Sequence, residues 1–510
     1  MRNRKSYLPG FILYVLVLFF AFFDFQDYIV KEPQSIHHWR QSDGASIALN
    51  YYQHGMDFFQ PEIHFQSADE NSQGYGVGEF PILYYISAGL YQQFGVHSSI
   101  IRLLNTLLFF LGLFYLYKAV YQRFKSLFWA LFIPTILAAS PVIVYYSNNY
   151  LPNTSALAFV CIAWYHIGQY DIYKKNSSVW FSALFFTLAG LLKITALISF
   201  FPLLGLAILG LLPFKRWRYF QHSIQATIAY LSTILLNFLW YNWAIAYNDN
   251  HGTSYFSTHT WPYNSLSEEM ISKVWYNIIH LWGDDYFYPA TYIFLLILVA
   301  IFLRYLKRQA VFWIYLLGSL SIGFIAFGYL FFLNLMNHDY YTINLYIIPV
   351  LLMIAILDYY KQTNHSIFQS RKWKFALTIF VLFNLKYGKD QLEKRYTGWQ
   401  NDMHLYTALD GIQPFLRAHD IAQEDKFLIA GDPTPNTALY RLNQQGWSDL
   451  YGNGDSVEKI QQLIDNKELQ YLVVLNDRFL TERPYLNVYC SKVKAEYNGL
   501  KIYDLSSFKN

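Results

Sequence analysis

Residues 10–23 read GFILYVLVLFFAFF, a run without any charged or amide side chain. With its flanking residues the run is long enough for a membrane helix, because roughly 20 apolar residues cross a bilayer. The basic segment MRNRK precedes it, as in a signal peptide, but no small-residue cleavage site follows. We therefore expect a retained first span over residues 8–26.

The composition of the whole chain also indicates a membrane protein. Of its 510 residues, 54% are hydrophobic and only 14% are charged, whereas a soluble domain carries about a quarter charged residues. The net charge of +4 is small and spread over short clusters, so it does not suggest a nucleic-acid partner. Cys161 lies in an apolar run and Cys490 near the C-terminus, and this pair does not predict a disulfide.

Apolar runs recur along the first three quarters of the chain. We expect about eleven transmembrane helices, near residues 8–26, 100–121, 127–146, 152–172, 178–192, 194–213, 221–245, 286–306, 310–333, 343–360 and 373–388. With this number of spans, all of the short basic clusters between the runs fall on one face, which the positive-inside rule assigns to the cytoplasm. The opposite loops then hold most of the Asp, Glu and His before residue 360.

The composition changes after residue 388. FLIA (427–430) and YLVVL (471–475) are typical of short buried strands, and VEKIQQLID (457–465) has helical periodicity. The sequence therefore predicts two domains: residues 1–388 form an α-helical polytopic membrane domain, and residues 389–510 form a small α/β domain outside the cytoplasm.

The first outer loop, residues 27–99, contains the polar cluster HHWRQSD (37–43), with His37, His38, Arg40 and Asp43. If SDGASIALNYYQHG is helical, Ser42 or Asp43 stands at its N-terminus, where a carboxylate caps free backbone N–H groups. Asp43 is then either a helix cap or a general base held by Arg40. His37 and His38 would orient the base or an acceptor.

A second polar group of the same loop lies in GYGVGEFPILYYI, residues 74–86. Glu79 stands before a proline that suits the first turn of a helix. We interpret residues 81–96 as an interfacial helix rather than a span, because they are apolar but rich in tyrosine. Placing a carboxylate above such an apolar helix costs free energy unless the carboxylate is paired with another polar group. This cost favours a partner or a ligand for Glu79. Tyr84 and Tyr85 would line the path of the substrate.

Two basic residues interrupt or border apolar runs. Lys193 stands within LAGLLKITALISF, and Arg102 begins the second span. Each could extend its charge to the membrane surface and have no further role. As functional candidates, both could bind a phosphate.

Further polar residues gather at the expected outer ends of later spans. MNHDYYTINLYIIP (336–349) places His338, Asp339, Tyr340 and Tyr341 together, as helix caps or as groups for a polar headgroup. Loop 246–285 is rich in His and Asp. A divalent metal is one alternative for these loops, with Glu79, His251 and His259 as candidate ligands, but their spacing is not diagnostic.

The order of these segments resembles that of the GT-C superfamily of polyprenyl-phosphate-sugar-dependent glycosyltransferases. Within it, the chain looks most like the family of protein O-mannosyltransferases and aminoarabinose transferases. The resemblance covers residues 8–360 and rests on six segments in sequence: WRQSDGASIALNYY, GEFPILYYISAGLYQQFG, IRLLNTLLFFLGLFYLY, YYSNNYLPNTSALAF, GLLKITAL and NHDYYTINLYIIP.

The resemblance implies a GT-C-like helical bundle with interfacial helices in the first outer loop. By position, Asp43 matches the acid that serves as catalytic base, and Glu79 matches an acid that binds a metal or the donor in some relatives. Lys193 and Arg102 match basic positions near the donor phosphate. Relatives often carry a pair of acids where this chain has Asp43-Gly44, and many carry a further acid where it has Asn153.

The function implied is transfer of a sugar, with inversion, from a polyprenyl-phosphate donor to a hydroxyl or amine at the outer membrane face. The acceptor would be a protein, a lipid or a glycan, and the membrane a bacterial inner membrane. The competing interpretations are a transporter or lipid flippase, and a membrane anchor for residues 389–510. Transporters place polar groups near mid-bilayer, whereas the charged residues here concentrate on one face.

Overall fold

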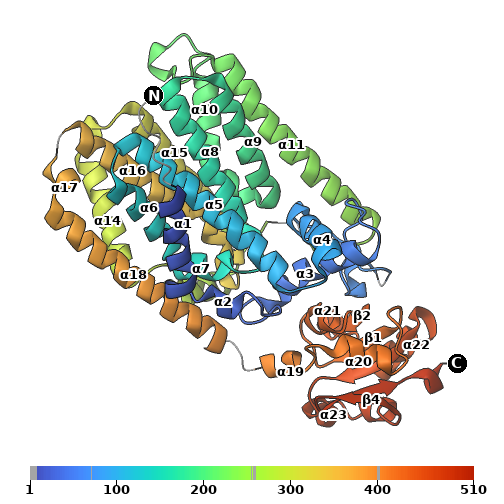
Figure 1. Cartoon of the computed structure of the whole chain (residues 1–510). Coiled ribbons are helices and arrows are strands. Elements are labelled where there is room, and N and C mark those ends of the chain that lie inside the picture. The colour runs from blue at the N-terminus through green and yellow to red at the C-terminus, as the bar shows by residue number, and fades with distance from the viewer. Residues whose placement is uncertain are drawn as a thin grey trace. The chain divides into compact units, whose positions relative to one another are not determined.

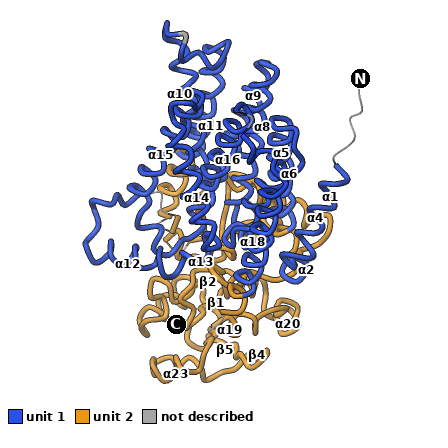
Figure 2. Tube along the Cα trace, turned by 90° about the vertical axis from the view of Figure 1, so that its left-hand side faces the viewer, with its two compact units in different colours: residues 1–28, 103–241, 259–393 blue, residues 29–102, 242–258, 394–510 orange. Residues whose placement is uncertain are grey.

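The computed structural model describes residues 8–70, 72–253, 255–256, 260–363, 365–398 and 402–509. The chain forms two compact units, drawn in blue and orange in Figure 2. Unit 1 comprises residues 1–28, 103–241 and 259–393, and unit 2 comprises residues 29–102, 242–258 and 394–510. Three long helices, α5, α11 and α18, continue from one unit into the other.

Unit 1 consists of helices (Figure 1). Its elements are α1 (Leu8–Val17), the π-helix η1 (Leu18–Phe22), α2 (Phe25–Tyr28), α5 (Ser99–Phe124), α6 (Leu127–Ala138), α7 (Pro141–Ser147), α8 (Asn153–Tyr173), α9 (Asn176–Leu192), η3 (Ile194–Ser199), α10 (Phe201–Leu209), α11 (Ser223–Asn250), α12 (Glu268–His280), α13 (Gly283–Tyr286), α14 (Pro289–Arg304), α15 (Val311–Leu330), η8 (Asp339–Tyr346), α16 (Ile347–Gln362), α17 (Ser366–Gln369) and α18 (Arg371–Gly398).

The long apolar helices make this unit a membrane domain. Within the described residues, four helical segments are long and apolar enough to cross a bilayer: α5, α11, α15 and η8 with α16. The pair α6 and α7 passes the same test but bends by 81°, because Pro141 begins α7 and holds the preceding residue in an extended conformation. Four shorter apolar segments fall at other expected spans, and the count of eleven stays a prediction.

Large apolar side chains cover the outside of several of these helices. Leu296 on α14 is 69% exposed, and Ile322 and Ile325 on α15 are 71% and 70% exposed. Such surfaces are unfavourable in water, whereas lipid tails solvate them without cost. The exposed apolar faces therefore agree with a bundle that is surrounded by lipid.

Unit 2 begins with the two helices of the first loop, α3 (His38–Gln53) and α4 (Ile82–Phe94). The helix in GEFPILYYI begins directly after Pro81, as expected. The expected start of α3 at Ser42 or Asp43 is wrong, because the helix begins at His38 after His37, whose φ is +55°. The helix begins a full turn earlier than expected, because Trp39, Arg40 and Gln41 are compatible with a helical backbone. Asp43 thus lies inside α3 and is not its cap.

The C-terminal part of unit 2 is an α/β fold with a five-stranded sheet in the order β2-β1-β3-β5-β4. Its elements are α19 (Met403–Thr407), α20 (Ile412–Ala418), β1 (Lys426–Ala430), α21 (Thr437–Leu442), β2 (Gly446–Ser448), α22 (Val457–Lys467), β3 (Leu469–Val474), α23 (Arg478–Glu482), α24 (Leu486–Tyr489), β4 (Val493–Tyr497) and β5 (Leu500–Asp504). Strands β2, β1 and β3 are parallel, and β5 is antiparallel to both β3 and β4.

The expected strands and helix of this region are confirmed. FLIA forms β1 and YLVV lies in β3, in the register Leu428 opposite Leu472. On α22, Ile460 and Ile464 point into the core around Trp447, as its period of 3.6 residues requires. The predicted domain division at residue 388 stays a prediction, while α18 itself continues to Gly398.

Candidate functional site

Asp43 is a fully buried carboxylate of unit 2. Its side chain has no exposed area. Its Oδ2 atom accepts a hydrogen bond of 2.8 Å from the hydroxyl of Tyr255 and lies 3.7 Å from Nη1 of Arg40. Its Oδ1 atom is buried and has no hydrogen-bond partner among the described residues. A buried carboxylate oxygen in this state is ready to accept a proton from a ligand.

The surroundings of Asp43 change its acidity. Burial is the main cause that raises the pKa of Asp43, from 3.8 to about 7, and it outweighs Arg40 and the Tyr255 hydroxyl, which lower it. The carboxylate of Glu79 adds a smaller upward shift. A general base acts best when its pKa is close to the working pH, so this environment suits proton abstraction near neutrality.

Arg40 joins Asp43 to Glu79. The Nη2 atom of Arg40 forms an ion pair with Glu79, whose side chain is only 10% exposed. The guanidinium also lies 5.7 Å from the ring centre of Phe256. The structure thus brings together Asp43, Arg40 and Glu79, all of which we had predicted as catalytic residues.

Tyr84 packs against α3 beside this cluster. A Cβ atom on Gly44 would lie 2.5 Å from the Tyr84 ring and 2.7 Å from its hydroxyl oxygen, so only glycine admits the ring here. The tyrosine ring therefore occupies the space next to α3 at Gly44. Burial raises the pKa of Tyr84, and the charge of Glu79 raises it further, so that the hydroxyl stays protonated.

The other predicted residues of the first loop contact protein groups. His38 shares a hydrogen bond of 3.0 Å with Thr437 at the start of α21, and burial lowers the pKa of His38 to about 3. His37 is buried beside Trp39. Arg102 is fully buried and donates to the carbonyl of Lys31 at 2.8 Å, the Tyr396 hydroxyl at 3.1 Å and two further oxygens.

Tyr85 is likewise part of the packing of unit 2. Its hydroxyl donates to the carbonyl of Met56 at 3.2 Å, and its ring packs edge-on against Tyr51 and Phe58. The substrate-binding roles of His37, His38, Arg102 and Tyr85 therefore stay predictions, and their contacts equally support a structural role.

The predicted residues of unit 1 form a second cluster. The ammonium group of Lys193, at the end of α9, lies 4.9 Å from the ring centre of Tyr341 and 5.8 Å from that of Tyr340. His338 packs on both tyrosine rings. Asp339 is fully buried and accepts a hydrogen bond of 2.7 Å from Tyr146. No ion pair of Lys193 occurs in the described part of the chain, so its charge is available to an anion.

An apolar groove of about 450 Å³ begins at the residue after Lys193. Its walls are η3, α10 and α15, with Ile198, Phe201 and Ile322 among the lining side chains. A positive charge next to such a groove suits a ligand with an anionic head and a hydrocarbon chain.

Two of the three candidate metal ligands, Glu79 and His251, lie within the described residues, and each contacts a protein group. Among the described residues there is no group of three or more His, Cys, Asp or Glu side chains that could hold a metal ion. Glu79 pairs with Arg40, and the Nδ1 atom of His251 lies 2.8 Å from the carbonyl of Tyr247. His259 lies outside the described residues.

Tyr255 is the residue of the site that the sequence did not reveal. It lies 212 positions after Asp43, in a loop without recognisable helix or strand periodicity. Its only local signal is a neighbouring aromatic, Phe256, which contacts Arg40. A hydrogen bond between a tyrosine hydroxyl and a carboxylate this far away in the sequence can be recognised only in the folded structure.

The chain thus combines a bundle of apolar helices, a helical first loop with a buried acid, and a small C-terminal sheet. Among solved structures, the chain is similar over its full length to "ArnT from Cupriavidus metallidurans bound to Undecaprenyl phosphate", with a TM-score of 0.65, 12% identity and 100% of both chains covered. The same protein in its apo state gives a TM-score of 0.63 at 12% identity, with 99% of each chain covered.

These comparisons confirm the predicted resemblance at the level of the fold. No model of a known protein family matches the sequence, and no curated protein matches it either. Fold similarity at 12% identity does not carry residue roles from one protein to another. The function of the site is therefore argued from its own geometry.

Proposed function

We propose that the chain is an inverting glycosyltransferase that moves a sugar from a polyprenyl-phosphate donor to a hydroxyl or amine. The single observation that carries the proposal is Asp43, a fully buried carboxylate with one oxygen engaged and the other without a partner among the described residues. The similar fold of a protein that binds undecaprenyl phosphate supports the choice of donor.

Asp43 would act as the general base. The acceptor oxygen or nitrogen attacks the anomeric carbon of the donor while its proton passes to Asp43, and the bond from that carbon to the phosphate oxygen breaks. A single displacement of this kind inverts the configuration at the carbon. Such proton transfer contributes typically about 10²–10⁴-fold to the rate.

Arg40 and Glu79 would keep the base in place. Because Arg40 pairs with Glu79, its charge is partly compensated and lowers the pKa of Asp43 less than a free guanidinium would. The Tyr84 ring covers one side of α3 at Gly44 and would exclude water from Asp43. These contacts support a base that is ionised in a large fraction of molecules at neutral pH and is basic enough to take a proton.

Lys193 and the groove beside it would hold the donor lipid. The ammonium group would bind the phosphate, and the apolar walls of η3, α10 and α15 would take the isoprenoid chain. A lysine that stabilises the charge developing on the leaving phosphate lowers the barrier directly. His338 would keep Tyr340 and Tyr341 in position around it. Asp339 would act on Tyr340 through Tyr146, which donates to Asp339 and packs against the Tyr340 ring.

The test is a transfer assay with the purified full chain in lipid nanodiscs and a panel of polyprenyl-phosphate sugars. We expect release of polyprenyl phosphate and labelling of an acceptor in a membrane extract with at least one donor. Asp43→Asn should abolish both, while Asp27→Asn, at an exposed aspartate of the same loop, should not. Normal turnover by Asp43→Asn would refute the base, and inactivity with every donor would refute the enzyme.

A further inference from the structure

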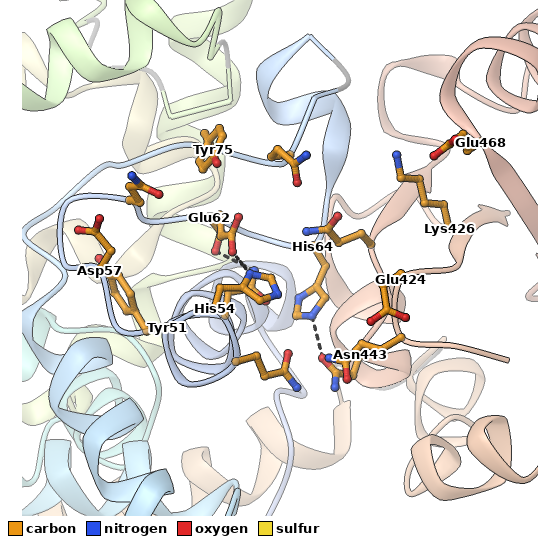
Figure 3. A pocket seen from close by; sticks show the side chains of 16 residues that line it. Tyr51, His54, Asp57, Glu62, His64, Tyr75, Glu424, Lys426, Asn443 and Glu468 are labelled. Atoms are coloured by element: carbon orange, nitrogen blue, oxygen red, sulfur yellow. Dashed lines mark hydrogen bonds and ion pairs between the residues drawn. The ribbon is translucent and has the colours of Figure 1, made fainter.

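A polar cavity of about 760 Å³ lies within unit 2 (Figure 3). No residue of the Asp43 cluster is among those that line it. One wall is formed by the end of α3 and by residues 57–75 of the first loop, and the other by residues 423–468. All sixteen lining residues are polar or tyrosine: seven are Asn or Gln, four are Asp or Glu, and the remaining five are two His, one Lys and two Tyr.

The walls of this cavity are fixed to each other. Residue Phe65 of the first loop pairs in parallel with Gly446, the first residue of β2, so that the loop extends the edge of the sheet. The N–H of Gly446 donates to the carbonyl of His64 at 3.0 Å, and His64 Nε2 lies 3.0 Å from Asn443 Oδ1. A Cβ atom at position 446 would lie 1.9 Å from the carbonyl oxygen of Phe427. The cavity is therefore preformed.

The charge of the cavity excludes anionic ligands. Four carboxylates, Asp57, Glu62, Glu424 and Glu468, outnumber the two basic residues that face them, Lys426 and His54. The hydrogen bond with Glu62 raises the pKa of His54. Burial lowers the pKa of His64 to about 4, so this imidazole is neutral at pH 7. The lining is negative overall, and a phosphate or a nucleic acid would be repelled. Because no aliphatic side chain is among the sixteen lining residues, a lipid chain would also find no matching surface.

The side chains of the lining match the chemistry of a carbohydrate. Amide side chains both donate and accept hydrogen bonds, and carboxylates accept them, so together they can satisfy a ligand with many neighbouring hydroxyl groups. Tyr51 and Tyr75 add ring surfaces. Tyr75 is held by ring contacts with Tyr247 and His251, which keep it beside the cavity.

Helix α3 connects this cavity to the proposed catalytic base. Asn50 and His54, which line the cavity, lie seven and eleven residues after Asp43. At 3.6 residues per turn Asn50 stands on the same helix face as Asp43, and a rise of 1.5 Å per residue places it roughly 10 Å farther along the axis. His54 directly follows the last residue of α3, at the end of this face. A chain-like ligand could contact both regions of the helix.

We propose that this polar cavity binds the carbohydrate part of the acceptor, an oligosaccharide that is neutral or carries amino groups and has no phosphate on the bound sugars. That the bound glycan is the acceptor rests on the proposed glycosyltransferase function. That the cavity binds a glycan does not depend on that function. The cavity selects the acceptor by its hydroxyl and amino groups, and α3 presents the bound chain toward Asp43.

The test measures binding to the full chain in nanodiscs by isothermal titration calorimetry. The probes are a tetramer of N-acetylglucosamine, a tetramer of glucosamine, and spermine as a cation without sugar. We expect both tetramers to bind, with the cationic tetramer binding more tightly. Gln60→Lys and Glu424→Lys, one exposed residue on each wall, should each weaken tetramer binding at least tenfold. Glu482→Lys, an exposed glutamate outside the cavity, should change it less than twofold.

Failure of this inference is distinguishable from failure of the proposed function. Absence of tetramer binding, binding that both cavity variants leave unchanged, or binding of spermine alone would overturn the glycan site even if Asp43-dependent transfer is observed. If no donor is turned over while both cavity variants abolish tetramer binding, the glycan site stands and the transferase is refuted. In an active preparation, the cavity variants should raise the KM for the acceptor and leave the KM for the donor unchanged.

Discussion

Two arginine–carboxylate clusters, one in each unit, differ in how completely their atoms are paired. In unit 1, Arg123 donates to both oxygens of Asp358 at 2.9 and 2.6 Å and to Asp171 at 3.1 Å. Trp313 donates to Asp358 at 3.0 Å, and Tyr219 donates to Asp171 at 2.7 Å. Every carboxylate oxygen of this cluster has a donor.

In unit 2, Arg40 lies between Asp43 and Glu79, but Oδ1 of Asp43 has no hydrogen-bond partner among the described residues. Leaving a buried acceptor unsatisfied costs free energy, and a fully paired cluster shows that this chain can avoid the cost. The Arg123 cluster satisfies all of its carboxylate oxygens, whereas the Arg40 cluster leaves one oxygen of Asp43 unsatisfied among the described residues, as the proposed role of Asp43 as a base requires.

Substitutions in the two clusters should differ most strongly in their effect on kcat. Asp43→Asn should lower kcat by about 10²–10⁴-fold, because the amide cannot take the proton. Asp358→Asn should leave kcat per folded molecule near the wild-type value and lower the melting temperature, because Arg123 loses a charged partner worth about 1.5–3 kcal/mol. Steady-state kinetics on the monodisperse fraction and thermal scans check both. Equal losses of kcat in the two variants would contradict a catalytic role for Asp43 that Asp358 does not share.

A second contrast concerns stability and pH. The folded state raises the pKa of Asp43 from 3.8 to about 7, so it binds this proton more tightly than the unfolded chain does. The cost of burying the charge therefore grows as pH rises from about 4 to about 7 and is complete above that, of the order of 4 kcal/mol. Asp43→Asn should thus melt at a higher temperature than wild type at pH 8.5, with a smaller gain at pH 5. A destabilised Asp43→Asn at pH 8.5 would contradict this sign.

A third prediction compares two lysines that lie over tyrosine rings. Lys193→Gln should raise the donor KM by about 10–100-fold, since a charge-assisted hydrogen bond to phosphate is worth about 1.5–3 kcal/mol. Lys118 lies 4.7 Å from the ring centre of Tyr165 and 4.9 Å from that of Tyr115. Lys118→Gln, the matched control, should leave the donor KM within about twofold of wild type. Equal effects would show that Lys193 acts through packing alone.

The smallest expected effect concerns Tyr255. Its hydroxyl stabilises the Asp43 carboxylate and lowers its pKa, so Tyr255→Phe should shift the rising limb of kcat/KM against pH upward from about 7 by about one unit. Activity at pH 7 should fall several-fold and recover at pH 9. A pH-independent loss would mean that Tyr255 only supports the fold.

Residue types and periodicity determined much of this protein from the sequence. Apolar runs predicted the membrane helices, because only helices satisfy the backbone within one segment in lipid. Alternating and continuous apolar patterns predicted β1, β3 and α22. The polar segments of the first loop identified Arg40, Asp43 and Glu79, since a chain with few charges has few candidates for chemistry.

Only the tertiary structure decided how these residues act. Local pattern placed Asp43 at a helix end, whereas contacts around the first turn of α3 extend the helix to His38 and turn Asp43 inward. The Tyr255 hydroxyl, the ring of Tyr84 over Gly44 and the pairing of Phe65 with Gly446 join segments far apart along the chain. Burial and hydrogen bonding, which set the pKa of a carboxylate and the shape of a cavity, depend on such distant neighbours and are not encoded in any short stretch of sequence.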